Sequence, residues 1–140
     1  MDSSTPNAKI AFIYPAKFNL NGANSPTLNF YAVGHRVAMS VGISFVDLDP
    51  NKSYIVSFTL TDSDSHEVVT SVGMNGIPSD QIDPRLHTSF LSASFYFDVS
   101  VSGTYRFSCQ LIDMLHNNGN AFESKDIYFN VIDDEAACHE

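Results

Sequence analysis

Two short acidic clusters are the residues whose types and spacing come nearest to a metal site. Asp47, Asp49 and Asn51 alternate along the chain as the first oxygen ligands of an EF-hand loop do. That loop also needs a Gly at its sixth position and a Glu at its twelfth, where this chain has Lys52 and Phe58. The match to a Ca²⁺-binding loop is therefore partial.

Asp62, Asp64 and Glu67 form a second oxygen cluster, which could share a Ca²⁺ ion with the first if both loops lay at one end of the molecule. Asp and Asn side chains also form Asx turns between strands, and Pro50 suits a tight turn. We favour the turn interpretation, and we predict that the protein has no resident metal or cofactor.

The residue types that serve nucleophilic catalysis form no recognisable set. The histidines are scattered along the chain, at His35, His66, His87, His116 and His139. The strand register points Cys109 into the core, and a disulfide to Cys138 is the less favoured reading. The sequence has neither a Gly-x-Ser-x-Gly elbow nor a glycine-rich phosphate loop. We predict that the protein is not an enzyme, with a small hydrolase using paired carboxylates as the less favoured alternative.

The elements that must position these residues have the period of β-strands. Apolar and polar residues alternate in eight segments, 10–14, 28–32, 41–45, 54–60, 67–72, 95–101, 105–111 and 127–131. In the first segment the alternating residues are Ile10, Phe12 and Tyr14. Apart from a short turn at 79–86, no stretch favours a helix. We therefore predict an all-β fold, an antiparallel sandwich of about seven or eight strands.

One late segment resembles the corner of an immunoglobulin-like sandwich. Gly103 and Tyr105 enter the segment as a Gly-x-Tyr pair, whose tyrosine hydroxyl would bond back to the corner. The immunoglobulin disulfide would require a Cys two residues after the tyrosine, where this chain has Phe107, and the sequence contains no Trp. The expected layout is thus immunoglobulin-like without the disulfide.

A long middle loop over 73–86 is the best candidate for a contact surface. Loops of this length are often functional, and an apolar centre with a charged rim suits a protein contact. The candidate partner-binding residues are Met74, Ile77, Asp80, Ile82, Asp83 and Arg85 in this loop, together with Asp62, Asp64 and Glu67. In the alternative interpretation, the loop is a strap that packs its apolar residues onto the sandwich edge. Tyr31 and Tyr96, on exposed faces, are further contact candidates.

Three pieces of the chain resemble a family of small bacterial and phage-associated β-sandwich proteins of unknown function. They are the segments 10–14 and 28–34, the strand and acidic turn at 54–62, and the segment 103–107 with the closing strand at 127–131. The likeness is one of layout over most of the chain. It implies a β-sandwich and a bacterial or mobile-element origin, and it supplies no catalytic residues.

Composition limits the possible partners. The chain has 140 residues and a formal net charge of −9, with 16 acidic and 7 basic residues, which argues against direct binding of nucleic-acid phosphates. The sequence predicts one domain, with frayed tails at 1–7 and 133–140. No apolar run is long enough for a membrane span, and the polar, acidic N-terminus does not resemble a secretory signal, so we expect a cytoplasmic protein.

Three functional hypotheses follow from these features. The first is a non-enzymatic binding module that contacts a protein partner through acidic loops and one sheet face. The second is a phage or mobile-element inhibitor that competes for the nucleic-acid channel of a host defence protein with its acidic surface. The third is a homo-oligomeric structural protein that associates through strand edges.

Overall fold

The computed structural model describes residues 8–18, 25–113 and 121–133, with backbone alone at 70–75 and 121–122. A short 3₁₀ helix, η1 (Ser79–Gln81), accompanies nine strands in this part of the chain. The strands are β1 (Lys9–Lys17), β2 (Ser25–Pro26), β3 (Asn29–Tyr31), β4 (Arg36–Val46), β5 (Tyr54–Thr61), β6 (Glu67–Ile77), β7 (Ser89–Asp98), β8 (Gly103–Asp113) and β9 (Ala121–Ile132). No helix of the described residues is long and apolar enough to cross a membrane.

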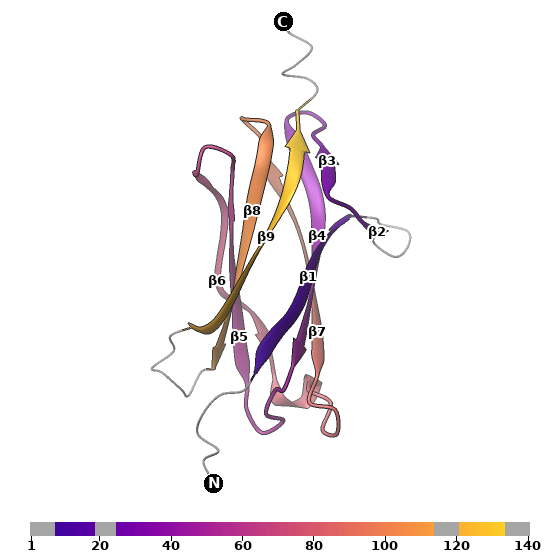
Figure 1. Cartoon of the computed structure of the whole chain (residues 1–140), viewed down its shortest axis with the longest axis vertical. Helices are drawn as coiled ribbons and strands as arrows, with labels where there is room; N and C mark the ends of the chain where they lie inside the picture. Colours follow the sequence, from indigo (N-terminus) through magenta and orange to yellow (C-terminus); the bar gives the residue numbers. More distant parts are fainter. Residues whose placement is uncertain (1–7, 19–24, 114–120, 134–140) are drawn as a thin grey trace, which may run out of the picture.

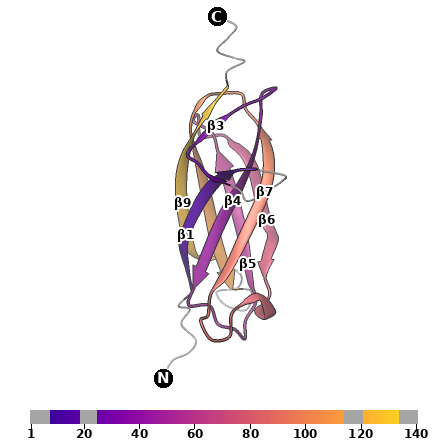
Figure 2. The ribbon, with the colours of Figure 1, turned by 90° about the vertical axis from the view of Figure 1, so that its right-hand side faces the viewer.

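The strands form two sheets packed face to face, as Figures 1 and 2 show. One sheet has the order β2-β1-β4-β7, and the other has the order β3-β9-β8-β5-β6. All neighbouring strands are antiparallel except β3 and β9, which pair in parallel. The predicted all-β sandwich is confirmed, with one parallel pair that the sequence pattern did not indicate.

The core lies between the sheets and is rich in aromatic rings. Along β8 the side chains of Tyr105, Phe107, Cys109 and Leu111 are fully buried, as the alternation predicted. Phe107 contacts the rings of Phe58 from the same sheet and Phe95 from the opposite sheet. Burial of apolar side chains from both sheets is the main force that holds the layers together.

The corner predicted at the start of β8 is present. The Tyr105 hydroxyl donates a 2.7 Å hydrogen bond to the carbonyl oxygen of Val101, which closes the turn between β7 and β8. Burial raises the pKa of this phenol to about 12. Asp133, which we expected in a frayed tail, is also fixed here, because its backbone N–H donates to the Ser102 hydroxyl and its carboxylate lies 2.6 Å from His35 Nδ1.

The first strand departs from the predicted alternation. The pairing of β1 with β4 shifts register between Ile10 and Phe12, so a β-bulge interrupts the strand. One extra residue reverses which side chains face inward. Ile13 is therefore buried, Phe12 is 54% exposed, and the prediction that Phe12 and Tyr14 point the same way as Ile10 is wrong.

The middle loop is shorter than predicted. Strand β6 continues to Ile77, so the first residues of the expected loop are part of a sheet. The connection to β7 then consists of η1 and a turn at 82–88. Strand β6 extends to Ile77 because residues 75–77 pair in antiparallel register with the start of β5.

The connections gather at two opposite ends, which Figure 1 shows as the lower and the upper end. The lower end carries the turn at 47–53 and the connection from β6 to β7. A hydrogen bond from the Leu48 N–H to the His87 carbonyl oxygen joins these two segments. The upper end carries the β5–β6 turn and the β7–β8 corner, which a bond from the Ser63 hydroxyl to the Ser102 carbonyl joins. These two ends determine which loops can act together.

Candidate functional site

The two acidic clusters lie at opposite ends of the sandwich. Asp47 and Asp49 belong to the lower end, whereas Asp62, Asp64 and Glu67 belong to the upper end (Figure 1). They cannot share a cation. Among the described residues, no three His, Cys, Asp or Glu side chains come together in a way that could hold a metal ion.

Each acidic cluster instead forms a turn. Asp49 Oδ1 accepts a 2.9 Å hydrogen bond from the Asn51 N–H. Asp62 Oδ1 accepts bonds from the N–H groups of Asp64 and His66, both at 2.9 Å. These are Asx-type turns, in which the carboxylate replaces a backbone acceptor, so the turn interpretation is confirmed.

A buried ion pair supports the lower end. Lys52 Nζ donates a 3.1 Å hydrogen bond to Asp113 Oδ2, and the Asp113 side chain is only 2% exposed. This bond raises the pKa of Lys52 above its ordinary value, against the desolvation that lowers it. Beside the pair, the Asp49 N–H donates to the Tyr54 hydroxyl oxygen. These bonds hold the turn at 47–53 against the start of β5 and the end of β8.

The connection from β6 to β7 divides its predicted contact residues into two groups. Ile77 and Ile82 are 2% and 3% exposed, so the prediction that they form an exposed apolar centre is wrong for these two side chains. They pack into the main core, as the strap interpretation required. Met74 lies in β6, and its side chain is outside the described part of the chain.

The charged residues of the same connection are exposed, namely Asp80, Asp83 and Arg85. Asp83 Oδ1 accepts hydrogen bonds of 2.8 Å from the N–H groups of Leu86 and Arg85. These bonds lower the pKa of the Asp83 carboxyl, the bond from Leu86 most strongly. Asp83 therefore shapes the turn that presents Arg85 and Leu86 to solvent.

Cys109 does not have the properties of a nucleophile. Its side chain is fully buried, and burial raises the pKa of the thiol to about 12. Catalytic cysteines have a lowered pKa and an accessible thiolate. Cys138 lies outside the described residues.

An exposed row of aromatic rings crosses the outer face of the β2-β1-β4-β7 sheet near its lower end. We call Phe12, Tyr14 and Phe90 the aromatic row. The ring centroids of Phe12 and Tyr14 are 6.4 Å apart, and those of Tyr14 and Phe90 are 6.3 Å apart, at interplanar angles of 27° and 26°. Phe12 and Phe90 are 54% and 53% exposed.

The strand between the rings makes room for them. Tyr14 pairs with Gly42 on β4, and a Cβ on that glycine would clash with the Tyr14 ring. Only a glycine allows the ring to lie across β4 toward Phe90. Ser44 lies opposite both Phe12 and Phe90, and Ser92 lies opposite Gly42, so the positions between the rings carry no charge.

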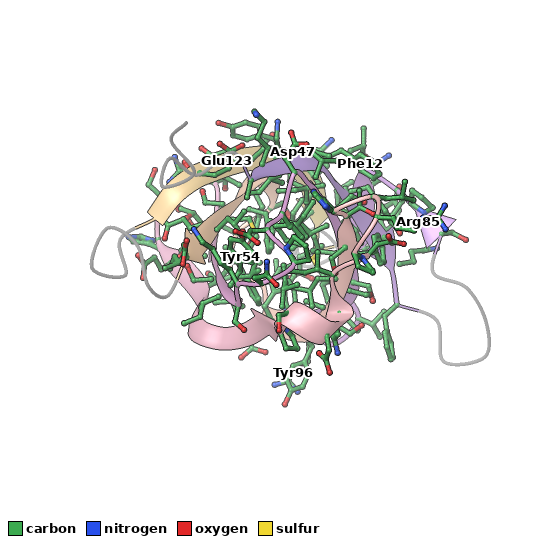
Figure 3. The ribbon with its side chains drawn as sticks, turned by 90° about the horizontal axis from the view of Figure 1, so that it is seen from below. Phe12, Asp47, Tyr54, Arg85, Tyr96 and Glu123 are labelled. Carbon is green, nitrogen blue, oxygen red and sulfur yellow. The ribbon has the colours of Figure 1, made fainter. Side chains whose placement is uncertain are left out.

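Sequence reasoning missed this row because the bulge in β1 cannot be read from the alternation. Gly42 within a strand pattern is the one signal that could have indicated it. Figure 3, seen from the lower end, places Phe12 and Arg85 toward the same side of the molecule. Tyr96, a predicted contact candidate that is 62% exposed, projects in a different direction.

The comparisons with known proteins identify a fold and no family. No protein-family model and no curated protein matches the sequence. Among solved structures, the C-terminal domain of wzt matches 91% of this chain and 75% of its own with a TM-score of 0.58 and 14% identity. The likeness shows that both chains share the β-sandwich fold.

Parts of larger enzymes have a similar fold. A Bacteroides uniformis β-glucuronidase matches 88% of this chain with a TM-score of 0.60 and 11% identity. A glycosyl hydrolase family 2 member from Bacteroides cellulosilyticus matches 77% with a TM-score of 0.56 and 8% identity. The chain spans only 14% and 17% of these two enzyme chains, so it is similar to one domain of each.

Proposed function

We propose that this chain is a non-catalytic binding domain that contacts a protein partner through the aromatic row and the adjoining turn at 82–88. The observation that carries the proposal is the row itself, in which Phe12 and Phe90 flank Tyr14 and remain more than half exposed. Exposed aromatic residues without intervening charges are typical of the centre of a protein interface.

The turn before β7 supplies a polar rim for this surface. Phe90 is the second residue of β7, so the turn that carries Asp83, Arg85 and Leu86 directly precedes it. Leu86 in this turn is 69% exposed and adds an apolar side chain to it. In this proposal Asp80, Asp83 and Arg85 keep the role of rim residues, while the rings replace Met74, Ile77 and Ile82 as the centre. Asp62, Asp64 and Glu67 lie at the other end and take no part.

The test is affinity capture from a bacterial lysate followed by in vitro titration of the purified candidate. We expect Phe12→Ala and Phe90→Ala each to weaken binding by about tenfold or more, because central aromatic residues dominate interface energies. Tyr128→Ala, which removes a ring of similar exposure (56%) from the other sheet, is the matched control. Binding that survives loss of both phenylalanines would refute the proposal.

The aromatic row could instead contact a second copy of this chain, and a further measurement must distinguish self-association from binding of a different protein. Light scattering at increasing concentration should show a monomer, because the proposed partner is a different protein. A dimer that Phe12→Ala dissociates would replace the proposal with self-association through the same face.

A further inference from the structure

The outer face of the other sheet carries a polar site that the aromatic row does not explain. Thr61, Arg106 and Tyr128 lie in one cross-strand row over β5, β8 and β9, since Thr61 pairs with Arg106 and Arg106 pairs with Tyr128. We call these residues and the two depressions beside them the Tyr128 site. Each depression has a volume of about 200 Å³, and Thr104 and Tyr128 line both.

The polar groups of this site have unused hydrogen-bonding capacity. Arg106 is exposed, and its guanidinium forms no ion pair or hydrogen bond with any side chain that the structure describes. Thr61 is only 7% exposed, yet its hydroxyl has no hydrogen-bond partner among residues 8–18, 25–113 and 121–133. A buried polar group without a partner requires an explanation, and a bound ligand or water supplies one.

The Asp62 carboxylate provides a hydrogen-bond acceptor at the same site. Asp62 lines the depression that Thr61 and Arg106 share. Its Oδ1 atom accepts the two bonds of the turn, whereas the contact of Oδ2 among the described residues is one of 3.9 Å with His66 Nδ1. The site therefore presents a guanidinium donor, hydroxyls that donate or accept, and a carboxylate acceptor around one exposed aromatic ring.

This combination matches the chemistry of a neutral sugar. A pyranose ring has a face of C–H groups that packs on an aromatic ring, and its hydroxyls both donate and accept hydrogen bonds. Tyr128 offers the ring, Arg106 offers donors to adjacent hydroxyls, and Asp62 and Thr61 offer acceptors. We propose that the Tyr128 site binds one uncharged pyranose residue of a saccharide, independently of the protein partner.

Charge argues for a neutral ligand over an anion at Arg106. The Asp62 carboxylate lines the same depression and would repel a phosphate or sulfate. The small volume of each depression suits a single sugar residue better than a folded segment of a protein.

The experiment is an NMR titration of the isotope-labelled full chain with glucose, galactose, mannose and N-acetylglucosamine at millimolar concentrations. At least one sugar should give saturable shifts in the amides of 61–66, 104–106 and 128–130. Tyr128→Ala should weaken that binding by about tenfold. Phe12→Ala, in the aromatic row, should leave it unchanged.

Three results would overturn the inference. The first is the absence of saturable shifts with all four sugars. The second is an equal response in the Tyr128→Ala variant, which would place the sugar elsewhere. The third is a response of the same amides to inorganic sulfate but to no sugar, which would make the site an anion site. Because Phe12→Ala and Tyr128→Ala serve as reciprocal controls, failure here leaves the proposed protein contact intact, and the reverse also holds.

Discussion

At the scale of single residues, two buried titratable groups of β8 contribute to the response of the fold to alkaline pH. Tyr105 and Cys109 lie on the same inward face, and both are fully buried. Burial raises the pKa of Tyr105 from 10.0 to about 12 and the pKa of Cys109 from 9.0 to about 12. Both groups are therefore kept neutral by the fold, as befits structural residues.

The protein should lose stability as the pH rises from about 9 to about 12. A raised pKa in the folded state means that the unfolded chain releases its proton first, so each group stabilises the fold fully below its unfolded pKa and loses this contribution above it. The loss from Tyr105 should be on the order of 2 kcal/mol. Urea unfolding at stepped pH measures it.

The Tyr105→Phe variant should show a shallower alkaline loss than the unmodified chain, from a lower starting stability, since the bond to Val101 is gone. Tyr96→Phe, which alters an exposed ring, should keep the original profile. Identical alkaline slopes in the unmodified chain and Tyr105→Phe would contradict the assignment.

At the scale of elements, local backbone geometry decides where strands begin and which side chains they expose. The bulge in β1 turns Phe12 outward, and Gly42 in β4 gives the Tyr14 ring its place. Gly103 begins β8 with a φ of +145°, where an added Cβ would lie 2.7 Å from Ser63 Cβ. The corner therefore depends on this glycine.

We expect Gly103→Ala to lower the free energy of unfolding by about 1–3 kcal/mol, because the substitution combines a strained φ with a steric clash at the β5–β6 turn. Gly76→Ala is the matched control within β6, where the nearest atom, the Tyr54 carbonyl oxygen, would be 3.6 Å away. That control should change stability by less than about 1 kcal/mol. Chemical denaturation of both variants makes the comparison, and equal effects would count against the role of Gly103.

At the scale of the whole molecule, the sandwich separates its acidic turns. The acidic turns of the described residues are not gathered at one end, since Asp47, Asp49, Asp80 and Asp83 belong to the lower end and Asp62, Asp64 and Glu67 to the upper end. A competitor for a nucleic-acid channel would draw its affinity from one dense acidic face. The aromatic row offers an uncharged contact instead.

Binding of the protein partner should therefore depend weakly on salt. We expect Kd to change by less than about threefold when ionic strength rises from about 0.05 M to about 0.5 M, since apolar contacts are not screened. Isothermal titration at several salt concentrations measures this. A much steeper loss, together with loss of binding on Asp80→Lys and Asp83→Lys, would favour the inhibitor hypothesis over the proposed contact.

The sequence by itself determined the fold class and the inward face of its regular strands. The alternation along β8 predicted the burial of Phe107 and Cys109, and the Gly-x-Tyr pair predicted the corner bond of Tyr105. It also favoured Asx turns at Asp49 and Asp62. These features could be predicted because a strand repeats every two residues and a turn depends on neighbours in the chain.

Only the tertiary structure decided which side chains the surface presents together. The bulge that exposes Phe12, the extension of β6 that buries Ile77, and the row formed by Thr61, Arg106 and Tyr128 all depend on pairing between distant strands. The same pairing placed the two acidic clusters at opposite ends. A register shift of one residue reverses a face without leaving a mark in the composition, and for that reason neither candidate surface could be read from the alternation pattern alone.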